Sequence, residues 1–243
     1  MSNNIVDRLG IQSWCFRGME NNSEVIEALK ECGVDRIELC GVHINFANNP
    51  EEVLKQYCDA GIKVSSYGVQ IFDDDKESSR KALDFAKLAD FDAIGGDFGP
   101  DGLETAEELC KEYGKKVAFH NHGRGHKINS MVHLDELFKN SSPNIGLCLD
   151  TAWMLDSGDD PLKAARKFKN RLYGVHIKDF VFDRAGRPED VVVGTGNLDL
   201  QALADFLKEI DFDGYLTLEY EGDVDDPVPA LKKCVEEIRK AFA

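Results

Sequence analysis

Two histidines that could hold a metal ion or carry a proton lie close together in the stretch KKVAFHNHGRGHKI, residues 115–128. His120 and His122 are two residues apart at the end of an apolar run, in a chain with six histidines in all. Successive side chains of a β-strand point to opposite faces, so the two histidines share one face and Asn121 takes the other. If that face is the inner one, His120 lies one layer deeper. The other histidines, His126, His133 and His43, lack this pattern and are expected in loops or on the surface.

Polar side chains also end the next three apolar runs of the chain. Asp150 ends NIGLCLD, His176 lies in LYGVHIKDF before Lys178 and Asp179, and Glu219 and Glu221 follow GYLTL. If these runs are neighbouring strands, two imidazoles and two carboxylates could converge on one divalent cation, and this set of ligands suits manganese, cobalt, zinc or iron better than magnesium. Taken singly, each has a simpler explanation: a strand-end histidine is often only hydrogen-bonded, Asp150 could cap a helix, and Glu221 could be solvated. Polar residues at four successive strand ends favour a metal site, because buried charge is costly unless it is paired or bound to a metal.

Short apolar segments alternate with amphipathic ones along the whole sequence. The first pair is LGIQSWCF and SEVIEALKECG, and the last is GYLTLEY and DPVPALKKCVEEIRKAF. Eight such strand–helix units predict a closed (β/α)₈ TIM barrel of the α/β class, with residues 1–243 as a single domain. A doubly wound open sheet is the alternative, but no glycine-rich phosphate turn follows the first strand. The longest irregular connection, residues 180–198, is expected on the catalytic face of the barrel.

The composition narrows the classes of partner. The net charge of −16 opposes binding to nucleic acid and to anionic membrane surfaces. The seven cysteines are odd in number and form no C-x-x-C motif, which favours a reducing cytoplasm over a disulfide framework or a zinc knuckle. Neither a signal peptide nor a membrane span is expected. A small carbohydrate is the expected partner, and whether the chain forms a homo-oligomer is left open.

Several motifs together resemble those of the sugar phosphate isomerase/epimerase-like superfamily of xylose isomerase-like TIM barrels. They are VAFHNHG, GLCLDTAWM, YGVHIKDF and VGTGNLDLQALADFLKEIDFDGYLTLEYE. The resemblance implies a divalent metal held by strand-end residues, which here fall on His120, Asp150, His176 and Glu219. At the first position many members have Glu where this chain has His120, so this residue could also fail to bind metal.

The same resemblance suggests roles for further residues. His122 lies where dehydratase-type relatives carry a histidine that resembles a general base, and Lys178 corresponds to a lysine that commonly touches substrate. Glu219 resembles one of the two facing glutamates that act as catalytic bases in the epimerases. Trp14 and Trp153 are more typical of core or wall positions, and in a sugar site they would form an aromatic wall for the substrate.

This chemistry would begin at a carbonyl of the substrate. A divalent ion chelated by the carbonyl and its neighbouring hydroxyl makes the adjacent C–H acidic and stabilises an enediolate. An unperturbed histidine titrates near ~6.5, so His122 would need little tuning to take this proton at neutral pH. Return of the proton gives isomerisation or epimerisation, and loss of a β-leaving group gives a lyase or dehydratase reaction. Whether the substrate carries a phosphate stays open, although four cations lie near the expected mouth: Arg124, Lys127, Arg184 and Arg187.

Two other classes remain as alternatives to an isomerase or epimerase. DNA repair by phosphodiester hydrolysis, as in the endonuclease IV relatives, is disfavoured by the charge of −16 and the lack of a basic stripe. A non-catalytic sugar-binding barrel is supported only by the replacement of the strand-end Glu by His120.

Overall fold

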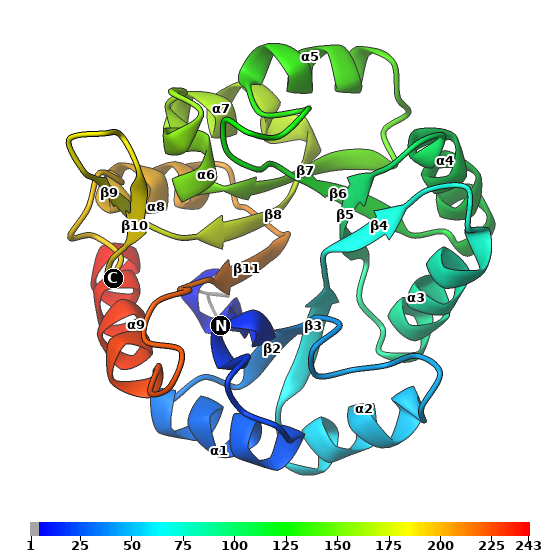
Figure 1. Cartoon of the computed structure of the whole chain (residues 1–243), viewed down its shortest axis with the longest axis horizontal. Helices are drawn as coiled ribbons and strands as arrows, with labels where there is room; N and C mark the ends of the chain where they lie inside the picture. Colours follow the sequence, from blue (N-terminus) through cyan, green and yellow to red (C-terminus); the bar gives the residue numbers. More distant parts are fainter. Residues whose placement is uncertain (1–4) are drawn as a thin grey trace.

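A computed structural model describes residues 5–243 and contains the expected barrel of parallel strands with helices around it (Figure 1). The predicted single TIM barrel fold is confirmed, and the doubly wound sheet is excluded by the closure of β1 on β11. The main sheet has the order β3-β2-β1-β11-β8-β7-β6-β5-β4. Its strands are β1 (Leu9–Gln12), β2 (Arg36–Leu39), β3 (Lys63–Tyr67), β4 (Gln70–Phe72), β5 (Ala93–Phe98), β6 (Lys116–His120), β7 (Ile145–Asp150), β8 (Leu172–Ile177) and β11 (Tyr215–Leu218).

The third predicted strand is split in two, which explains why the sheet has nine segments for eight barrel positions. β3 pairs with β2, whereas β4 pairs with β5, and only residues 68 and 69 separate them. At this point Gly68 packs closely on the next strand, because a Cβ there would lie 3.0 Å from Gly95 Cα and 2.9 Å from Glu38 Oε1. The chain itself therefore joins the two ends of the sheet.

The helices cover the outside of the barrel (Figure 1). They are α1 (Asn22–Cys32), α2 (Pro50–Asp59), α3 (Lys76–Leu88), α4 (Gly102–Tyr113), α5 (Met131–Lys139), α6 (Thr151–Asp156), α7 (Pro161–Phe168), α8 (Leu200–Glu209) and α9 (Val228–Phe242), with short 3₁₀ turns η1 (Ile5–Arg8), η2 (Ser13–Phe16) and η3 (Lys169–Arg171). The first predicted strand, 9–16, is too long: it ends at Gln12, whose side chain accepts a hydrogen bond from Trp14 N and so begins η2. None of the helices in residues 5–243 has the length and apolar character needed to cross a membrane.

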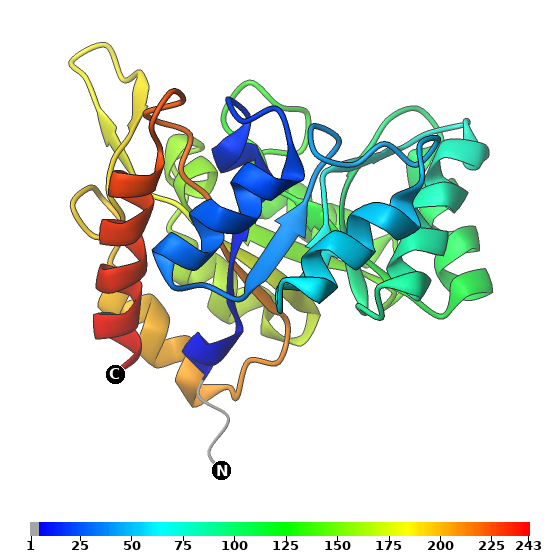
Figure 2. The same cartoon turned by 90° about the horizontal axis from the view of Figure 1, so that it is seen from below.

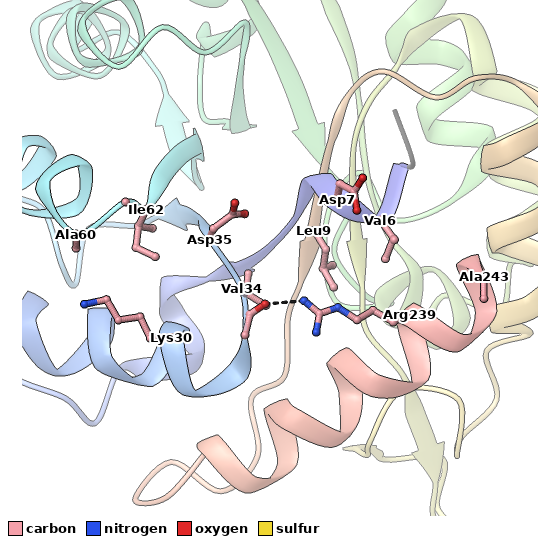
Figure 3. A pocket seen from close by; sticks show the side chains of 12 residues that line it. Val6, Asp7, Leu9, Lys30, Val34, Asp35, Ala60, Ile62, Arg239 and Ala243 are labelled. Carbon is pink, nitrogen blue, oxygen red and sulfur yellow. Dashed lines mark hydrogen bonds between the residues drawn. The ribbon is translucent and has the colours of Figure 1, made fainter. Parts of the chain in front are cut away.

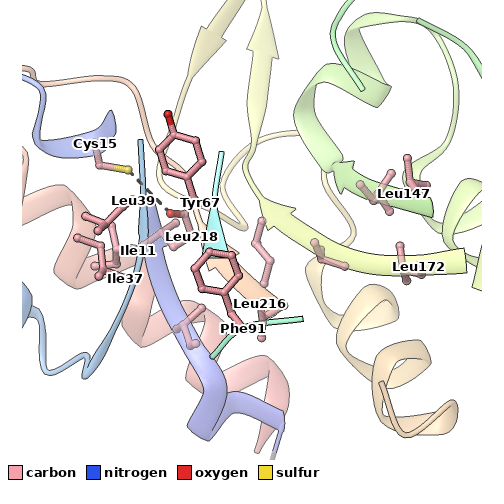
Figure 4. Packing of buried hydrophobic residues seen from close by; sticks show 14 of the residues in the cluster. Ile11, Cys15, Ile37, Leu39, Tyr67, Phe91, Leu147, Leu172, Leu216 and Leu218 are labelled. Atoms are coloured by element: carbon pink, nitrogen blue, oxygen red, sulfur yellow. Dashed lines mark hydrogen bonds between the residues drawn. The ribbon is translucent and has the colours of Figure 1, made fainter. Parts of the chain in front are cut away.

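The core follows from the alternation of side chains along the strands. Ile11, Ile37, Leu216 and Leu218 are buried in the large apolar cluster that Figure 4 shows in part. The residues between them point the other way, into the barrel. Along β6 to β8 this inner face carries a small residue and then, two positions later, a polar one: Ala118 and His120, Cys148 and Asp150, Gly174 and His176. The strands thus place small side chains deeper in the barrel and polar, titratable ones at the carboxyl ends of the strands.

The predicted irregular segment 180–198 contains a hairpin of β9 (Phe180–Phe182) and β10 (Pro188–Asp190), which differs from the expectation of a structureless loop. The hairpin rises at the same end of the barrel as the carboxyl ends of the strands, whereas the short turn η1 lies at the opposite end (Figure 2). The segment therefore lies on the expected catalytic face.

Candidate metal centre and substrate cavity

Four buried side chains from four adjacent barrel positions meet at the carboxyl ends of the strands. They are His120, Asp150, His176 and Glu219, and their nearest donor atoms all lie within 4.8 Å of one another. His120 Nε2 lies 3.1 Å from His176 Nδ1, 3.6 Å from Asp150 Oδ2 and 3.9 Å from Glu219 Oε2. His176 Nδ1 lies 3.2 Å from Glu219 Oε2. The structure thus brings together the four residues that the sequence predicts as metal ligands.

Glu38 on β2 is a fifth member of this group that the sequence analysis missed. Its Oε2 lies 2.8 Å from His176 Nε2 and accepts a hydrogen bond of 2.9 Å from the Thr217 hydroxyl. If His176 Nε2 keeps its proton for Glu38, the lone pair of Nδ1 is turned toward the other three side chains. A carboxylate behind a histidine is the usual support of a metal-binding imidazole. A charged residue between Ile37 and Leu39, two apolar residues of a short strand, was the signal that could have revealed it.

Asp150 divides its two oxygens between a structural contact and the site. Oδ1 accepts a hydrogen bond of 2.8 Å from Trp153 N and caps α6, so the helix-cap alternative is also correct. Oδ2 is buried without a hydrogen-bond partner within residues 5–243, and the same holds for His120 Nδ1. Because a buried polar atom without a partner is costly, the orphaned Oδ2 facing two imidazoles fits a divalent cation. The nitrogen and carboxylate donors match the preferences of zinc, manganese, cobalt or iron.

The protonation of this group depends on burial and on its neighbours. Burial raises the pKa of Asp150 to about 7. Burial also raises the pKa of Glu219, but Lys178 and His176 outweigh it and hold this pKa well below its usual range. Burial lowers the pKa of His120 to about 4, with His176 adding to the effect. The nearby Cys148 keeps its proton, because burial raises the pKa of its thiol, and it is therefore a poorer ligand than the carboxylates.

Lys178 lies among carboxylates, behind the residues that face the cavity. Its side chain is fully buried, its Nζ pairs with Glu221, and it lies 3.8 Å from Glu219 Oε2 and 3.9 Å from Asp190 Oδ1. Burial lowers the pKa of Lys178, but Glu219 and the other carboxylates raise it above its ordinary value. The ammonium group is therefore positively charged. In this structure it orients two carboxylates, and the prediction that it also touches substrate stays a prediction.

A cavity of about 250 Å³ opens beside the candidate ligands, and His120 and Glu219 of this group line it. Its lining residues are Gln12, Trp14, Cys40, Gly68, Val69, His120, His122, Trp153, Glu219 and Glu221. The predicted aromatic wall is therefore at the cavity: Trp14 donates a hydrogen bond of 3.2 Å from Nε1 to Glu221 Oε2, and the Trp153 ring packs edge-on against Phe180 at 5.0 Å.

His122 lies above His120, as the alternation along the chain predicts. β6 ends at His120, so His122 follows the strand, yet the two ring centroids are only 4.7 Å apart. His122 Nδ1 is buried without a hydrogen-bond partner within residues 5–243. The expectation of a pKa near neutrality for His122 is wrong for this structure, because burial and then His120 lower it to about 3. His122 is consequently neutral at pH 7, which is the form that can accept a proton.

One of the remaining histidines differs from expectation. His126 lies in the loop between β6 and α5, as expected, where its Nε2 lies 3.1 Å from Asp97 Oδ2 and its ring centroid 4.7 Å from that of His122. His43 is buried and contacts Met19 O at 3.3 Å, so it is a core residue rather than a surface one. His133 is exposed in the first turn of α5, as expected.

Two of the sequence motifs have a structural explanation at the strand ends. In LDT, the Thr151 hydroxyl accepts a hydrogen bond of 2.9 Å from Lys178 N and donates one of 2.6 Å to Lys178 O, which ties β7 to β8. In HIKD, the Asp179 carboxylate accepts four backbone N–H bonds of 2.8 to 3.0 Å from residues 194, 196, 197 and 198. Only glycine fits at position 196, because a Cβ there would lie 2.4 Å from Asp179 Oδ1. Asp179 therefore holds the segment that carries Asp190.

The Asn121 side chain points to the opposite face from the histidines and forms hydrogen bonds with the backbone. It donates a hydrogen bond of 3.0 Å to Asp150 O and accepts one of 2.9 Å from Asp150 N. This buried amide fixes the end of β7 relative to the end of β6. It thereby fixes the position of Asp150 relative to His120 along the barrel axis.

A second and larger cavity, of about 770 Å³, lies at the opposite end of the barrel (Figure 3). Its charged lining residues are exposed: Asp7, Lys30, Asp35 and Arg239. Arg239 donates a hydrogen bond to Gly33 O. None of the predicted site residues lines this cavity.

Comparison with known proteins gives relatives that share the barrel. An inosose dehydratase from Clostridium tetani is 29% identical over 137 residues, which cover 50% of this chain and 46% of that protein. The chain thus spans about half the length of the curated relatives it matches. The crystal structure of a 3-keto-D-glucoside 4-epimerase from E. coli has a TM-score of 0.76 at 21% identity, and the alignment covers 96% of this chain and 99% of that one. The structure of the IolI protein with a bound zinc atom has a TM-score of 0.73 at 18% identity, with 97% and 99% covered. At this identity, both structures show the shared fold alone.

The family comparison covers the half of the chain that contains the candidate site. The sequence model of the xylose isomerase-like TIM barrel family matches residues 100–241. This range includes β6 to β11 and therefore all four candidate ligands. The chain belongs to the xylose isomerase-like TIM barrel family.

Proposed function

We propose that this protein is an enzyme that removes a proton from the carbon next to a carbonyl group of a sugar, keto-sugar or cyclitol. The proposed net reaction is isomerisation or epimerisation, and the proposed cofactor is a divalent metal ion held by His120, Asp150, His176 and Glu219. One observation carries the proposal: four buried donor groups, including the orphaned Asp150 Oδ2, converge under a cavity that also exposes His122 and Glu219. The named activities of the relatives support the substrate class.

The chain's own residues divide the chemistry between them. A bound divalent cation would polarise the substrate carbonyl, which makes the neighbouring C–H acidic. His122, which faces the cavity, is the proposed acceptor of the proton. The Glu219 carboxylate, which faces the same cavity, is the group on the side of β11 that can exchange a proton with the substrate. Lys178 helps to keep Glu219 ionised and pairs with Glu221, and Trp14 and Trp153 hold the ring of the substrate.

Elimination of water or another leaving group is the second candidate reaction. It is favoured by His120 at a position where many relatives carry a glutamate, because an epimerase with two facing carboxylate bases would lack one of them here. The inosose dehydratases among the sequence relatives support the same alternative. Both reactions begin with the same loss of a proton, so they share the roles of His122 and of the metal ligands.

Deuterium exchange tests the shared first step. We expect the metal-loaded protein in deuterated water to place deuterium at the carbon next to the carbonyl of at least one compound in a panel of keto-sugars, aldoses and inososes, read by NMR. His122→Ala should abolish the exchange, whereas His133→Ala, a change at an exposed position, should not. Exchange at an unchanged rate in His122→Ala would contradict the assigned base, and no exchange with any compound would contradict the proposed reaction. Products that have lost water would identify the elimination.

A further inference from the structure

The carboxyl groups around the cavity greatly outnumber the cations. Glu219 and Glu221 line the cavity, and Glu38, Asp150 and Asp190 lie behind them. Within residues 5–243, Lys178 is the one lysine or arginine whose side chain pairs with these carboxyl groups, and its fully buried side chain is surrounded by Asp190, Glu219 and Glu221. One divalent cation in addition to Lys178 would still leave a net negative charge on these five carboxyl groups. Negative charge next to the cavity repels an anionic substituent on a substrate at short range.

The arginines nearest the mouth already have partners. Arg124 donates two hydrogen bonds to Asp156 Oδ1, at 3.0 Å from Nε and 2.8 Å from Nη2, and Nη2 also donates to Gly186 O at 2.9 Å. Arg17 stacks on the Trp14 ring at 5.2 Å and donates to the carbonyl oxygens of Trp14 and Glu221. These guanidinium groups hold the loops of the mouth together instead of facing the cavity.

The other cations that the sequence offered for a phosphate are also outside the cavity. Arg187 pairs with Asp183 at 2.6 Å inside the β9–β10 hairpin. Arg184 and Lys127 are exposed and are not lining residues. No arginine or lysine lines the cavity within the described residues. The usual donors for a phosphate group are therefore missing from the place where a substrate would bind.

The size and chemistry of the lining fit an uncharged polyhydroxy ring. The cavity of about 250 Å³ is smaller than the ~300–1,000 Å³ of pockets for drug-sized ligands, so it suits a single ring. Trp14 and Trp153 offer apolar faces, while Gln12 and Glu221 offer groups for hydroxyls. Glu221 is fixed from both sides, by Lys178 at Oε1 and by Trp14 Nε1 at Oε2. A fixed carboxylate accepts hydrogen bonds from hydroxyls and repels an anion.

We propose that the cavity selects an uncharged monosaccharide or cyclitol and excludes the phosphate esters of the same compounds, with Glu221 as the residue that contributes most to this selection. The inference rests on the proposed function only for the place where the substrate binds. It assigns Arg124 and Arg17 to the architecture of the mouth and not to phosphate recognition.

Matched pairs of compounds test the selection by direct binding. The metal-loaded protein is titrated in a calorimeter with inositol, D-fructose and D-glucose, and with inositol phosphate, fructose 6-phosphate and glucose 6-phosphate. We expect at least one uncharged compound to bind, and each ester to bind at least 100-fold more weakly than its uncharged counterpart. An ester that binds as well as or better than its counterpart, or a failure of all uncharged compounds to bind, would overturn the proposal.

A substitution at Glu221 tests the cause of the selection. Glu221→Gln keeps the shape of the side chain and removes its charge, so we expect the ratio of ester to uncharged affinity to rise at least tenfold. Glu189→Gln, at an exposed position of β10, should leave the ratio unchanged. An unchanged ratio in Glu221→Gln would contradict the role of this residue. Because binding is measured without turnover, uncharged compounds that bind but do not exchange deuterium would refute the proposed reaction and leave the selection standing.

Discussion

The two ends of the barrel differ in a way that separates a reactive site from a surface hollow. The amino end has the larger cavity, about 770 Å³, and its charged residues are exposed to solvent. The carboxyl end has about 250 Å³, and below it lie five buried or half-buried carboxyl groups, two buried histidines and one buried lysine. Exposed charges interact weakly through water, whereas buried charges interact strongly and shift one another's pKa.

The lesson of this contrast is that convergence of buried polar groups marks the site better than volume does. Arg239 at the amino end donates to a backbone carbonyl and has an ordinary surface role. Asp150 at the carboxyl end has an oxygen with no hydrogen-bond partner in residues 5–243 and faces two imidazoles. Removing groups at the carboxyl end should therefore change metal binding and turnover, and removing groups at the amino end should change neither.

The largest effect is expected at Asp150. Asp150→Ala removes a charged candidate ligand, so the purified protein should lose its divalent metal and its activity. Since Asp150 Oδ1 also caps α6, Asp150→Asn, which keeps an oxygen for the cap, checks that the loss does not come from misfolding. Elemental analysis gives the metal content, and His126→Ala is the matched control that should keep it. Stoichiometric metal in Asp150→Ala would contradict the site.

The next effect concerns turnover with the metal in place. His122→Ala should lower kcat by roughly 10²–10⁴ and leave metal content and substrate binding unchanged, because a proton-transfer base acts in the transition state. Steady-state kinetics and elemental analysis on the same preparation measure both. If His122→Ala loses metal while His120→Ala keeps it without activity, the roles of the two histidines are reversed.

A smaller effect is expected from the residue behind the site. Glu38→Gln removes the carboxylate that holds His176 Nε2 at 2.8 Å, and metal affinity should fall by about 10–100-fold. Competition with a chelator of known affinity measures the change. Glu236→Gln, at an exposed position of α9, is the control. If Glu38→Gln has the metal affinity of the unaltered protein, Glu38 does not support the metal site.

Metal affinity should also depend on pH. Burial raises the pKa of Asp150 to about 7, and a metal ligand must be deprotonated, so cation and proton compete for this carboxylate. Affinity should therefore fall as the pH drops below about 7, by up to tenfold for each pH unit through competition at this one carboxylate. Titrations at several pH values measure this slope, and a flat profile between pH 5 and 7 would contradict the competition.

The smallest effect is expected at the amino end. Arg239→Ala removes an exposed guanidinium from the larger cavity, so kcat, KM and metal content should stay unchanged, and the free energy of unfolding should change by about 0.5 kcal/mol or less. Kinetics and chemical denaturation measure these values. A marked loss of activity would mean that the larger cavity belongs to the function.

The sequence predicts the barrel because the alternation of short apolar and longer amphipathic segments survives in the structure. It also predicts the four candidate ligands, because strand ends on one edge of a parallel sheet must meet. It misses Glu38, since one charged residue in an apolar strand reveals its partner only when β2 and β8 face each other across the barrel. It misses the contact of His126 with Asp97 and the low pKa of His122, because both depend on how loops pack and how deeply side chains are buried.

The most direct test of the account is to locate the metal in a crystal of the manganese-loaded protein by anomalous scattering at the manganese edge. The account predicts one strong peak between His120 Nε2, Asp150 Oδ2, His176 Nδ1 and Glu219 Oε2, and no such peak in crystals of Asp150→Asn treated in the same way. A peak only at Asp97, His122 and His126, which also bring possible ligand atoms within 4.8 Å of one another, would contradict it. So would a fully loaded crystal with no peak at the carboxyl end of the barrel.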